Sequence, residues 1–335
     1  MFTTRIGRRV KAVRHACLML AAAASMMLGA SAAHAAWPER AISLIVPFPA
    51  GSSPDLLARM VSEPLAAALG QPIIIENKPG AGGNIGTRMA AHARPDGYTL
   101  LFTINGPLVT APTLYKNTLG YDPFTDLTPV SLVATSPNVL VVPSSLGVSN
   151  VREFVELARR RPGVLNYGSV GAGSASQLAM EMFKDRAGLD IVHIPYAGFP
   201  QIITAVIAGD IQSAFMVPAL AMAQSREGKA KVLAVTSLEP VATLPGIATM
   251  AQQGYPGFEA ISWDALLAPA GTPAPIIERL NSELAKIIAS DKVREQMAVQ
   301  YFTPAYSTPE ALTARMRDEK GRWDAVIAKL NLSLD

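Results

Sequence analysis

Strand-like apolar runs alternate with amphipathic segments along most of the chain. Strands are predicted at 42–47, 72–76, 98–103, 139–142, 165–169, 191–194, 211–216, 232–236 and 266–268. Helices are predicted over 55–69, 151–161, 175–187, 201–208, 275–289 and 309–330, with a further short helix that ends at residue 93. This alternation predicts an α/β fold with mostly parallel sheets, and the length favours two lobes over one. We expect a buried strand at 72–76, because it contains three successive isoleucines.

Capping residues mark the start of two of these helices. Asn150 precedes the helix that begins at Val151, and Glu153 completes a capping box with it. Thr308 caps the last helix, and Pro309 occupies its first position, where the missing N–H costs nothing. In folds of this type ligands bind beyond the carboxyl ends of the strands. The strand-to-helix loops are therefore the expected place for chemistry.

The first 35 residues have the pattern of a secretory signal peptide. Five basic residues and no acidic residue come before an apolar run at 16–30, and the small-x-small motif Ala33-His34-Ala35 follows. A membrane span is the alternative, but the run is shorter than the ~20 residues that a span needs. We therefore expect cleavage near Ala35 and export to the periplasm. Lys11 stands where a twin-arginine signal would have an apolar residue, which favours the general secretory route.

Removal of residues 1–35 changes the charge of the chain. The full chain has 29 Lys+Arg against 26 Asp+Glu and a formal charge of +3, whereas the remaining 300 residues carry 24 against 26, a net charge of −2. Without a basic stripe, a nucleic-acid partner is not expected. The single cysteine, Cys17, lies in the signal, and His92 and His193 have no ligand-like spacing. We therefore expect no disulfide, thiol chemistry, metal site or cofactor.

Two strand-to-helix loops have the composition of an anion site. In the first, residues 47–55, Gly51 permits an unusual backbone angle, Ser53 is the expected N-cap, Pro54 fits the first helical position and Asp55 the first turn. The second loop, residues 168–176, has the same order of strand, Gly-rich loop and helix. Two helix N-termini that face one cleft could hold a carboxylate between their free N–H groups. An ordinary capped turn is the structural alternative at each loop.

The other polar motifs favour structural roles. The loop at 80–86 has the wrong glycine spacing for a dinucleotide fingerprint and contains no Walker motif, so we expect a tight turn. Arg59, four residues after Asp55, is expected to form a local ion pair with it. Tyr196 either offers a hydroxyl and an aromatic wall to a ligand or packs at a strand end. His193 is expected to be half-buried and hydrogen-bonded rather than catalytic. Ser174 has no Gly-x-Ser-x-Gly motif or recognisable triad around it, so no enzyme is predicted.

Taken together, segments spread over the whole mature chain resemble one family. The segments are 37–40 (WPER), 45–51 with Asp55, 76–86 (ENKPGAGGNIG), 95–100 (PDGYTL), 167–174, 195–198 (PYAG), 233–237 (LAVTS) and 268–273 (APAGTP). In this order they are similar to the Bug, or TctC-like, periplasmic solute-binding proteins, which are the receptors of tripartite tricarboxylate transporters.

This resemblance implies a two-lobed, Venus-flytrap fold whose chain crosses between the lobes near residues 135 and 262. Residues 36–135 and 262–335 would form lobe 1, and residues 136–261 lobe 2. A ligand carboxylate would be held between the first-strand loop and the loop at 168–176, partly through ordered waters. Carried over by position, the ligand-binding residues are Phe48, Ala50, Gly51, Ser52, Ser53, Asp55, Thr103, Asn105, Ser169, Gly171, Gly173, Ser174, Ala175, Tyr196 and Gly198.

Three positions depart from the family pattern. The family usually has Gly-Gly where this chain has Gly51-Ser52, often Ser-Thr where it has Ser53-Pro54, and commonly histidine where it has Gln177. Pro54 lacks an N–H, so one potential donor to an anion is missing.

The expected function is that of a monomeric receptor for a small organic anion. An organic acid, an aromatic carboxylate or an amino acid would be captured and delivered to membrane permease subunits of the tripartite tricarboxylate type. The alternative is a subunit that presents its ligand to the periplasmic domain of a sensor kinase, and a secreted α/β hydrolase is a remote one.

Overall fold

The computed structural model describes residues 37–171 and 173–335 of the 335-residue chain. The predicted signal peptide and its cleavage site lie outside the described residues. By its internal contacts the chain divides into residues 1–39 and Arg40–Asp335. The account below concerns the second unit.

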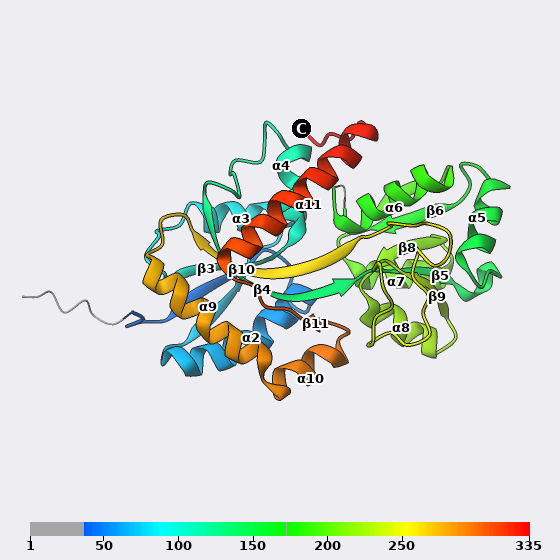
Figure 1. Cartoon of the computed structure of the whole chain (residues 1–335). Coiled ribbons are helices and arrows are strands. Elements are labelled where there is room, and N and C mark those ends of the chain that lie inside the picture. The colour runs from blue at the N-terminus through cyan, green and yellow to red at the C-terminus, as the bar shows by residue number, and fades with distance from the viewer. Residues whose placement is uncertain (1–36, 172) are drawn as a thin grey trace, which may run out of the picture. The chain divides into compact units, whose positions relative to one another are not determined.

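Two sheets organise this unit (Figure 1). The first contains, in spatial order, β11 (Thr303–Pro304), β4 (Leu127–Pro137), β10 (Ile261–Pro269), β3 (Thr99–Ile104), β1 (Ile42–Val46) and β2 (Ile73–Asn77). The second contains β7 (Val192–Pro195), β6 (Asn166–Ser169), β8 (Ser213–Met216), β5 (Val139–Pro143) and β9 (Ala230–Val235). The predicted two-lobed α/β fold is therefore confirmed.

Both sheets are mixed rather than mostly parallel. Strand β1 is parallel to β2 and β3, and β6 is parallel to β7 and β8. In contrast, β10 is antiparallel to both β3 and β4, and β5 is antiparallel to β8 and β9. The cause is the long pair β4 and β10, which lie side by side in Figure 1 and carry the chain between the sheets in opposite directions.

The two crossing segments are tied together by hydrogen bonds. Asn138, between β4 and β5, donates from Nδ2 to the carbonyl oxygen of Ala260 at 3.0 Å. Thr236 Oγ1 contacts the same carbonyl at 2.8 Å and accepts from the Asn138 N–H at 2.9 Å. All three residues are buried. The lobe boundaries proposed from the sequence, 135/136 and 261/262, lie within a few residues of this tie.

Helices flank each sheet. Around the first sheet lie α2 (Ser53–Leu69), α3 (Asn84–Ala91), α4 (Ala111–Leu114), α9 (Ala274–Ala289), α10 (Asp291–Val299) and α11 (Pro309–Lys329). Around the second lie α5 (Val151–Arg159), α6 (Ala175–Ala187), α7 (Phe199–Ala208) and α8 (Pro218–Arg226). Two of the predicted caps are confirmed: Asn150 accepts from the Glu153 N–H at 2.9 Å, and Thr308 accepts from the Ala311 N–H at 3.2 Å.

Several elements differ from the sequence prediction. Strand β2 is an edge strand and not a buried one, since Ile74 is 55% exposed. Helices α4, α8 and α10, strands β4 and β11, and the first half of β10 were not predicted. These segments carry prolines or polar residues that interrupt the apolar pattern, such as Pro129 in β4 and Asp264 in β10.

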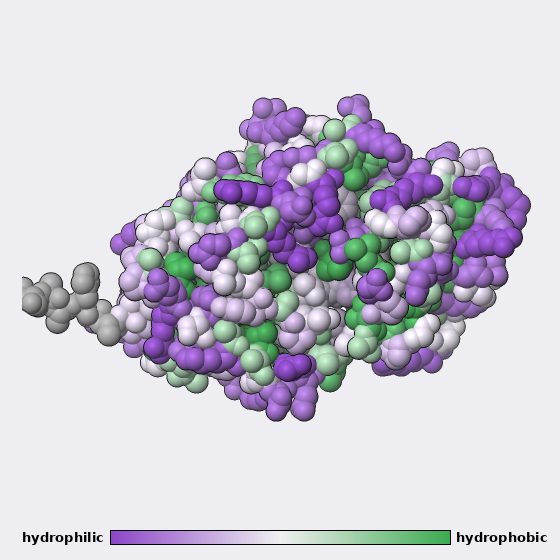
Figure 2. Space-filling model, viewed as in Figure 1, coloured by the Kyte–Doolittle hydropathy of each residue, from purple (hydrophilic) through white to green (hydrophobic). Residues whose placement is uncertain are grey.

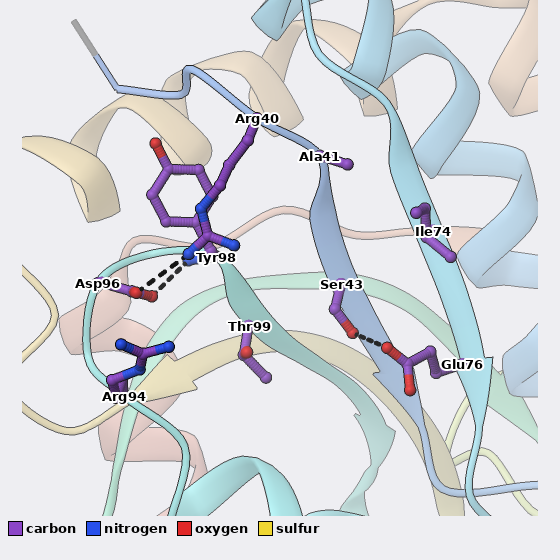
Figure 3. A pocket seen from close by; sticks show the side chains of 9 residues that line it. All are labelled: Arg40, Ala41, Ser43, Ile74, Glu76, Arg94, Asp96, Tyr98 and Thr99. Carbon is purple, nitrogen blue, oxygen red and sulfur yellow. Dashed lines mark hydrogen bonds and ion pairs between the residues drawn. The ribbon is translucent and has the colours of Figure 1, made fainter. Parts of the chain in front are cut away.

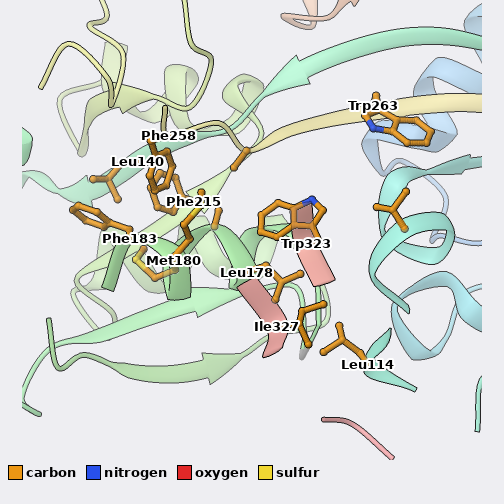
Figure 4. Packing of buried hydrophobic residues seen from close by; sticks show 14 of the residues in the cluster. Leu114, Leu140, Leu178, Met180, Phe183, Phe215, Phe258, Trp263, Trp323 and Ile327 are labelled. Atoms are coloured by element: carbon orange, nitrogen blue, oxygen red, sulfur yellow. The ribbon is translucent and has the colours of Figure 1, made fainter. Parts of the chain in front are cut away.

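One hydrophobic cluster extends through both sheets (Figure 4). It includes Leu101 of β3 and Leu140 of β5, both fully buried. Helix α11 contributes Trp323 and Ile327, and in Figure 4 Ile327 lies between Leu178 of α6 and Leu114 of α4. Burial of each such side chain stabilises the fold by about 1.5–3 kcal/mol. The two sheets thus share this cluster, with α11 as a common element.

The surface is mostly hydrophilic on the face shown in Figure 2, with hydrophobic positions in small groups among polar ones. Large exposed hydrophobic side chains, such as Val299 at 74% and Val164 at 63%, belong to different elements. In the part of the chain that the structure describes, no helix is both long enough and apolar enough to cross a bilayer.

Candidate ligand-binding site

The first predicted loop leads from β1 into α2, and its N-cap is Ser52 rather than the expected Ser53. Ser52 has extended backbone angles (φ −71°, ψ 161°), which makes Ser53 the first helical residue and Pro54 the second. Gly51 has φ +79°, the conformation that its position in the turn requires. The N–H groups of Ser53 and Asp55 belong to the first turn, where no helical carbonyl is available. Pro54 leaves a gap between these two donors.

Asp55 is buried beneath this loop and stabilises it through hydrogen bonds. It is 1% exposed, and its carboxylate accepts from the Gly51 N–H at 2.8 Å, from Asn77 Nδ2 at 2.9 Å and from Arg59 Nε and Nη2 at 3.0 Å each. Burial raises the pKa of Asp55, but the hydrogen bonds from Arg59, Asn77 and Gly51 and the charge of Arg59 outweigh burial and lower it. The predicted Asp55–Arg59 ion pair is therefore present. Since this carboxylate is fully engaged, its geometry suits a brace for the loop better than a ligand contact.

The third Gly-rich segment, residues 80–86, supports the first loop. Gly80, Gly82 and Gly83 all have positive φ, so the segment is the tight turn that the sequence predicts. A Cβ on Gly83 would lie 2.7 Å from Phe48 Cζ, so glycine allows the Phe48 ring to pack against this turn. Phe48 is half-buried and its carbonyl accepts from Asn77 Nδ2 at 3.0 Å, whereas Ala50 is exposed.

Thr103 and Asn105 lie at the carboxyl end of β3, and both are buried. Asn105 donates from Nδ2 to Glu319 Oε1 at 2.7 Å and to the Ile261 carbonyl at 3.1 Å. Glu319 also accepts from Trp263 Nε1 at 2.5 Å, so Asn105 joins α11 to β10. Among the described residues, Thr103 Oγ1 and Asn105 Oδ1 have no hydrogen-bond partner. Asn105 therefore has a structural contact and one unused acceptor.

The second predicted loop leads from β6 into α6. Ser174 is the N-cap of α6, its Oγ accepting from the Gln177 N–H at 3.3 Å and donating to the Gly171 carbonyl at 2.7 Å. Gly171 and Gly173 have φ values of +102° and +75°. A Cβ on Gly173 would lie 2.8 Å from Leu114 and Leu334, so this loop packs against the first lobe. Ala175 is the first residue of α6.

Three side chains behind this loop were not recognised as a group from the sequence. Ser169 is fully buried, and its Oγ lies 2.7 Å from His193 Nε2. His193 Nδ1 lies 3.3 Å from Gln177 Nε2, and Gln177 Oε1 accepts from the Gly173 N–H at 2.5 Å. His193 is half-buried and stacks on the Tyr167 ring at 4.9 Å between centroids. The side chain therefore has the hydrogen-bonded, half-buried setting that the sequence predicts.

Tyr196 and Gly198 follow β7, beside the second loop. The Tyr196 N–H donates to the Ser169 carbonyl at 2.9 Å, and its ring edge would lie 3.3 Å from a Cβ on Gly168. Gly198 is the N-cap of α7 with an extended backbone. The structure thus brings Ser169, Gly171, Ser174, Tyr196 and Gly198 to one end of the second sheet, as it brings residues 48–55, Thr103 and Asn105 to one end of the first.

Two cavities lie away from these loops. One, of about 210 Å³, is lined by Arg40, Ser43, Glu76, Asp96 and Tyr98 among others, at the amino ends of β1 and β3 (Figure 3). The other, of about 340 Å³, lies between α6 and α11. Neither contains a residue of the predicted site. The loops are therefore favoured by their helix N-termini and not by an enclosed volume.

Comparisons with known proteins show the family to which the chain belongs. The model of the family described as "Tripartite tricarboxylate transporter family receptor" (TctC) matches residues 57–332. Protein BugT of Bordetella pertussis is 36% identical over 303 residues, which cover 89% of this chain and 91% of BugT. The solved structure of the periplasmic binding protein BugD is 34% identical with a TM-score of 0.81, and it covers 89% of this chain and 99% of its own.

A further solved relative contains a ligand. Rpa4515 of R. palustris with adipate is 33% identical with a TM-score of 0.84, and the match covers 89% of this chain and 99% of that one. The family is one of periplasmic solute-binding proteins and not of enzymes. The resemblance found in the sequence is thereby confirmed, and the chain belongs to the TctC family of tripartite tricarboxylate transporter receptors.

Proposed function

We propose that this chain is a periplasmic receptor that captures a small carboxylate between the N-termini of α2 and α6. The observation that carries the proposal is the pair of helix starts with serine at the N-cap position, Ser52 before α2 and Ser174 before α6, each at the carboxyl end of a parallel strand. The side chain of Ser174 makes the capping hydrogen bond, and that of Ser52 makes none. Helices of 17 and 13 residues place partial positive charge and free N–H groups at these ends. No basic side chain stands in either loop, so backbone donors and hydroxyl groups would neutralise the anion.

The adipate bound to Rpa4515 supports a carboxylate ligand, because that protein shares the fold and a third of its residues with this chain. We propose as contacts those residues of the two loops that are exposed or half-buried, whereas Asp55 holds the first loop in shape. The family description, that of a transporter receptor, supports delivery of the ligand to membrane permease subunits, and we propose that the receptor acts as an exported monomer.

The test pairs carboxylates with their neutral amides in a thermal-shift assay. Adipate and shorter dicarboxylates are compared with the corresponding diamides. At 100 times its dissociation constant, a ligand adds about 2.7 kcal/mol to the free energy of unfolding. We expect carboxylates to raise the melting temperature and the diamides to leave it unchanged.

Two proline variants test the assigned donors. Ser53→Pro and Ala175→Pro each remove one N–H at the first position of a helix, where proline is well tolerated. Loss of one hydrogen bond to a charged group should weaken carboxylate binding by roughly 10- to 100-fold. Asp291→Pro makes the same change at the start of α10 and serves as control. If both site variants bind as the control does, the anion does not lie between these helices.

A further inference from the structure

A chain of hydrogen bonds links the second loop to a histidine on the edge strand of the second sheet. We propose that Gln177, His193 and Ser169 act as a positioning relay that fixes Gly171 and the Gly173 amide while His193 is neutral and releases the Gly173 amide when His193 takes up a proton. The relay joins three elements, β6, β7 and α6, and it ends at Gly171 and Gly173 of the loop.

The directions of the bonds follow from the donors available. Ser169 donates its one hydroxyl hydrogen to the Gly171 carbonyl at 3.0 Å, so toward His193 Nε2, at 2.7 Å, it acts as acceptor. His193 therefore carries its proton on Nε2 and presents a bare Nδ1. That nitrogen accepts from Gln177 Nε2 at 3.3 Å, which turns Gln177 Oε1 toward the Gly173 N–H at 2.5 Å. One tautomer and one amide orientation satisfy all four contacts.

The surroundings of His193 favour this neutral form. Ser169 is fully buried and Gln177 is 9% exposed. Burial lowers the pKa of His193, with a smaller opposing effect from Glu181 and a further lowering from Lys184. These two groups, both on α6, pair with each other at 2.9 Å, and Glu181 also accepts from Tyr167 OH at 2.5 Å. The charged groups that face the ring are thus engaged with one another.

Protonation breaks the relay at one contact. A hydrogen on Nδ1 would face the Gln177 NH₂, so two donors would oppose each other and the amide would have to rotate. Rotation points Nε2 at Gly173 and removes the acceptor of its N–H. Ser169 and Ser174 still donate to the Gly171 carbonyl, so the backbone is released at the Gly173 amide alone. The loop then changes shape, and the consequence for ligand affinity rests on the proposed function.

The relay itself is tested without any ligand. Long-range ¹H–¹⁵N spectra of the full chain report the ring nitrogens of His193, assigned by their loss in His193→Asn. We expect the Nε2–H tautomer at pH 8, and a titration in which the Gly173 amide signal moves together with the His193 ring. The matched control is His92→Asn. His92 is the C-cap residue of α3 and contacts the Gly120 carbonyl, so its replacement should leave the His193 ring and Gly173 amide signals unchanged.

Two substitutions at Gln177 separate positioning from simple packing. In Gln177→Glu one carboxylate oxygen can accept from the Gly173 N–H and the other from His193 Nδ1–H. The neutral ring should therefore carry its proton on Nδ1 and the pKa of His193 should rise. The Gly173 amide signal should keep its position in acid. In Gln177→Leu the Gly173 signal should lose its pH dependence. An Nδ1–H tautomer in the unaltered chain, or a Gly173 signal that ignores the His193 titration, would overturn the relay.

Adipate serves as the probe for the effect on binding. If the second loop holds the carboxylate, adipate should bind about tenfold more weakly at a pH where His193 is protonated than at a pH where it is neutral. This is the effect expected for the loss of one hydrogen bond. Gln177→Glu should retain its affinity in acid. If adipate fails to bind at any pH while the ring and amide signals behave as described, the relay stands and the proposed ligand is wrong.

Discussion

Asp264 places a carboxyl group inside the first sheet with little to stabilise its charge. It is 2% exposed and pairs with Ile104 and Ala134 in the neighbouring strands. None of the described residues donates a hydrogen bond to its Oδ1. Burial alone raises the pKa of Asp264 to about 8. A protonated carboxyl is therefore the form that the folded chain prefers near neutral pH.

This preference predicts an unusual pH dependence of stability. Between about pH 4 and pH 8 the folded chain holds a proton on Asp264 that the unfolded chain has lost, so stability falls as pH rises, by at most ~1.4 kcal/mol per pH unit from this group. Asp264→Asn should remove that slope and raise the free energy of unfolding at pH 8. Urea unfolding from pH 5 to pH 9 measures it, with the exposed Asp318→Asn as control. Parallel curves for Asp264→Asn and the unaltered chain would contradict the burial argument.

At this scale the sequence identified residues better than it identified their roles. The spacing of Asp55 and Arg59 predicted their ion pair correctly, because both lie on one helix. The N-cap was misplaced by one residue, since Ser52 and Ser53 are equally suitable and only the backbone angles distinguish them. Gln177 and His193 are 16 residues apart on different elements, and no local pattern shows that they meet. The assignment of ligand contacts remains a prediction.

At the scale of the elements, two helical glycines differ in how closely their surroundings pack against them. Gly86, in α3, faces the residues that directly follow β1 and β2. A Cβ at this position would lie 2.7 Å from the Lys78 carbonyl oxygen and 2.8 Å from Pro47 Cβ. Gly321, in α11, is exposed with open space around it. The first glycine permits close packing of a helix against β1, whereas the second only weakens its helix.

Alanine substitutions should therefore act in opposite directions. Gly86→Ala should destabilise the chain by about 1–3 kcal/mol, since neither backbone neighbour can move aside easily. Gly321→Ala should stabilise it by roughly 0.5–1 kcal/mol, because alanine loses less backbone entropy in a helix. Denaturant unfolding of the two variants measures both effects. A stabilising Gly86→Ala would show that α3 is not packed as closely as described.

Element prediction succeeded where apolar periodicity and capping coincide. Helices α5 and α11 begin at the capped positions that the sequence indicates. It failed for β4, in which prolines and serines interrupt the apolar residues although the strand is mostly buried. That strand is stabilised by pairing with β10 and β11, and such long-range pairing leaves no local signature.

For the whole molecule, the shared core decides how the lobes unfold. The hydrophobic cluster contains residues of both lobes. Two ion pairs, each at 2.7 Å, join α11 to the second lobe: Arg322–Glu259, just before β10, and Lys329–Asp185 of α6. The crossing strands β4 and β10 pair with each other. Exposed ion pairs contribute little, so the cluster carries most of this coupling. Trp323, which is 7% exposed and donates from Nε1 to Glu319, belongs to this cluster.

We therefore expect one cooperative transition in differential scanning calorimetry, with equal calorimetric and van't Hoff enthalpies, despite the presence of two sheets. Trp323→Ala should cost about 3–5 kcal/mol and should also separate the transition into two, because the cavity lies where α11 joins the lobes. Val299→Ala, at a side chain that is 74% exposed, should change neither the midpoint nor the shape. Two transitions in the unaltered chain would mean that each lobe is stable by itself and that the cluster does not couple them. In that case the lobes would be coupled by a ligand bound between them and not by the hydrophobic cluster that they share.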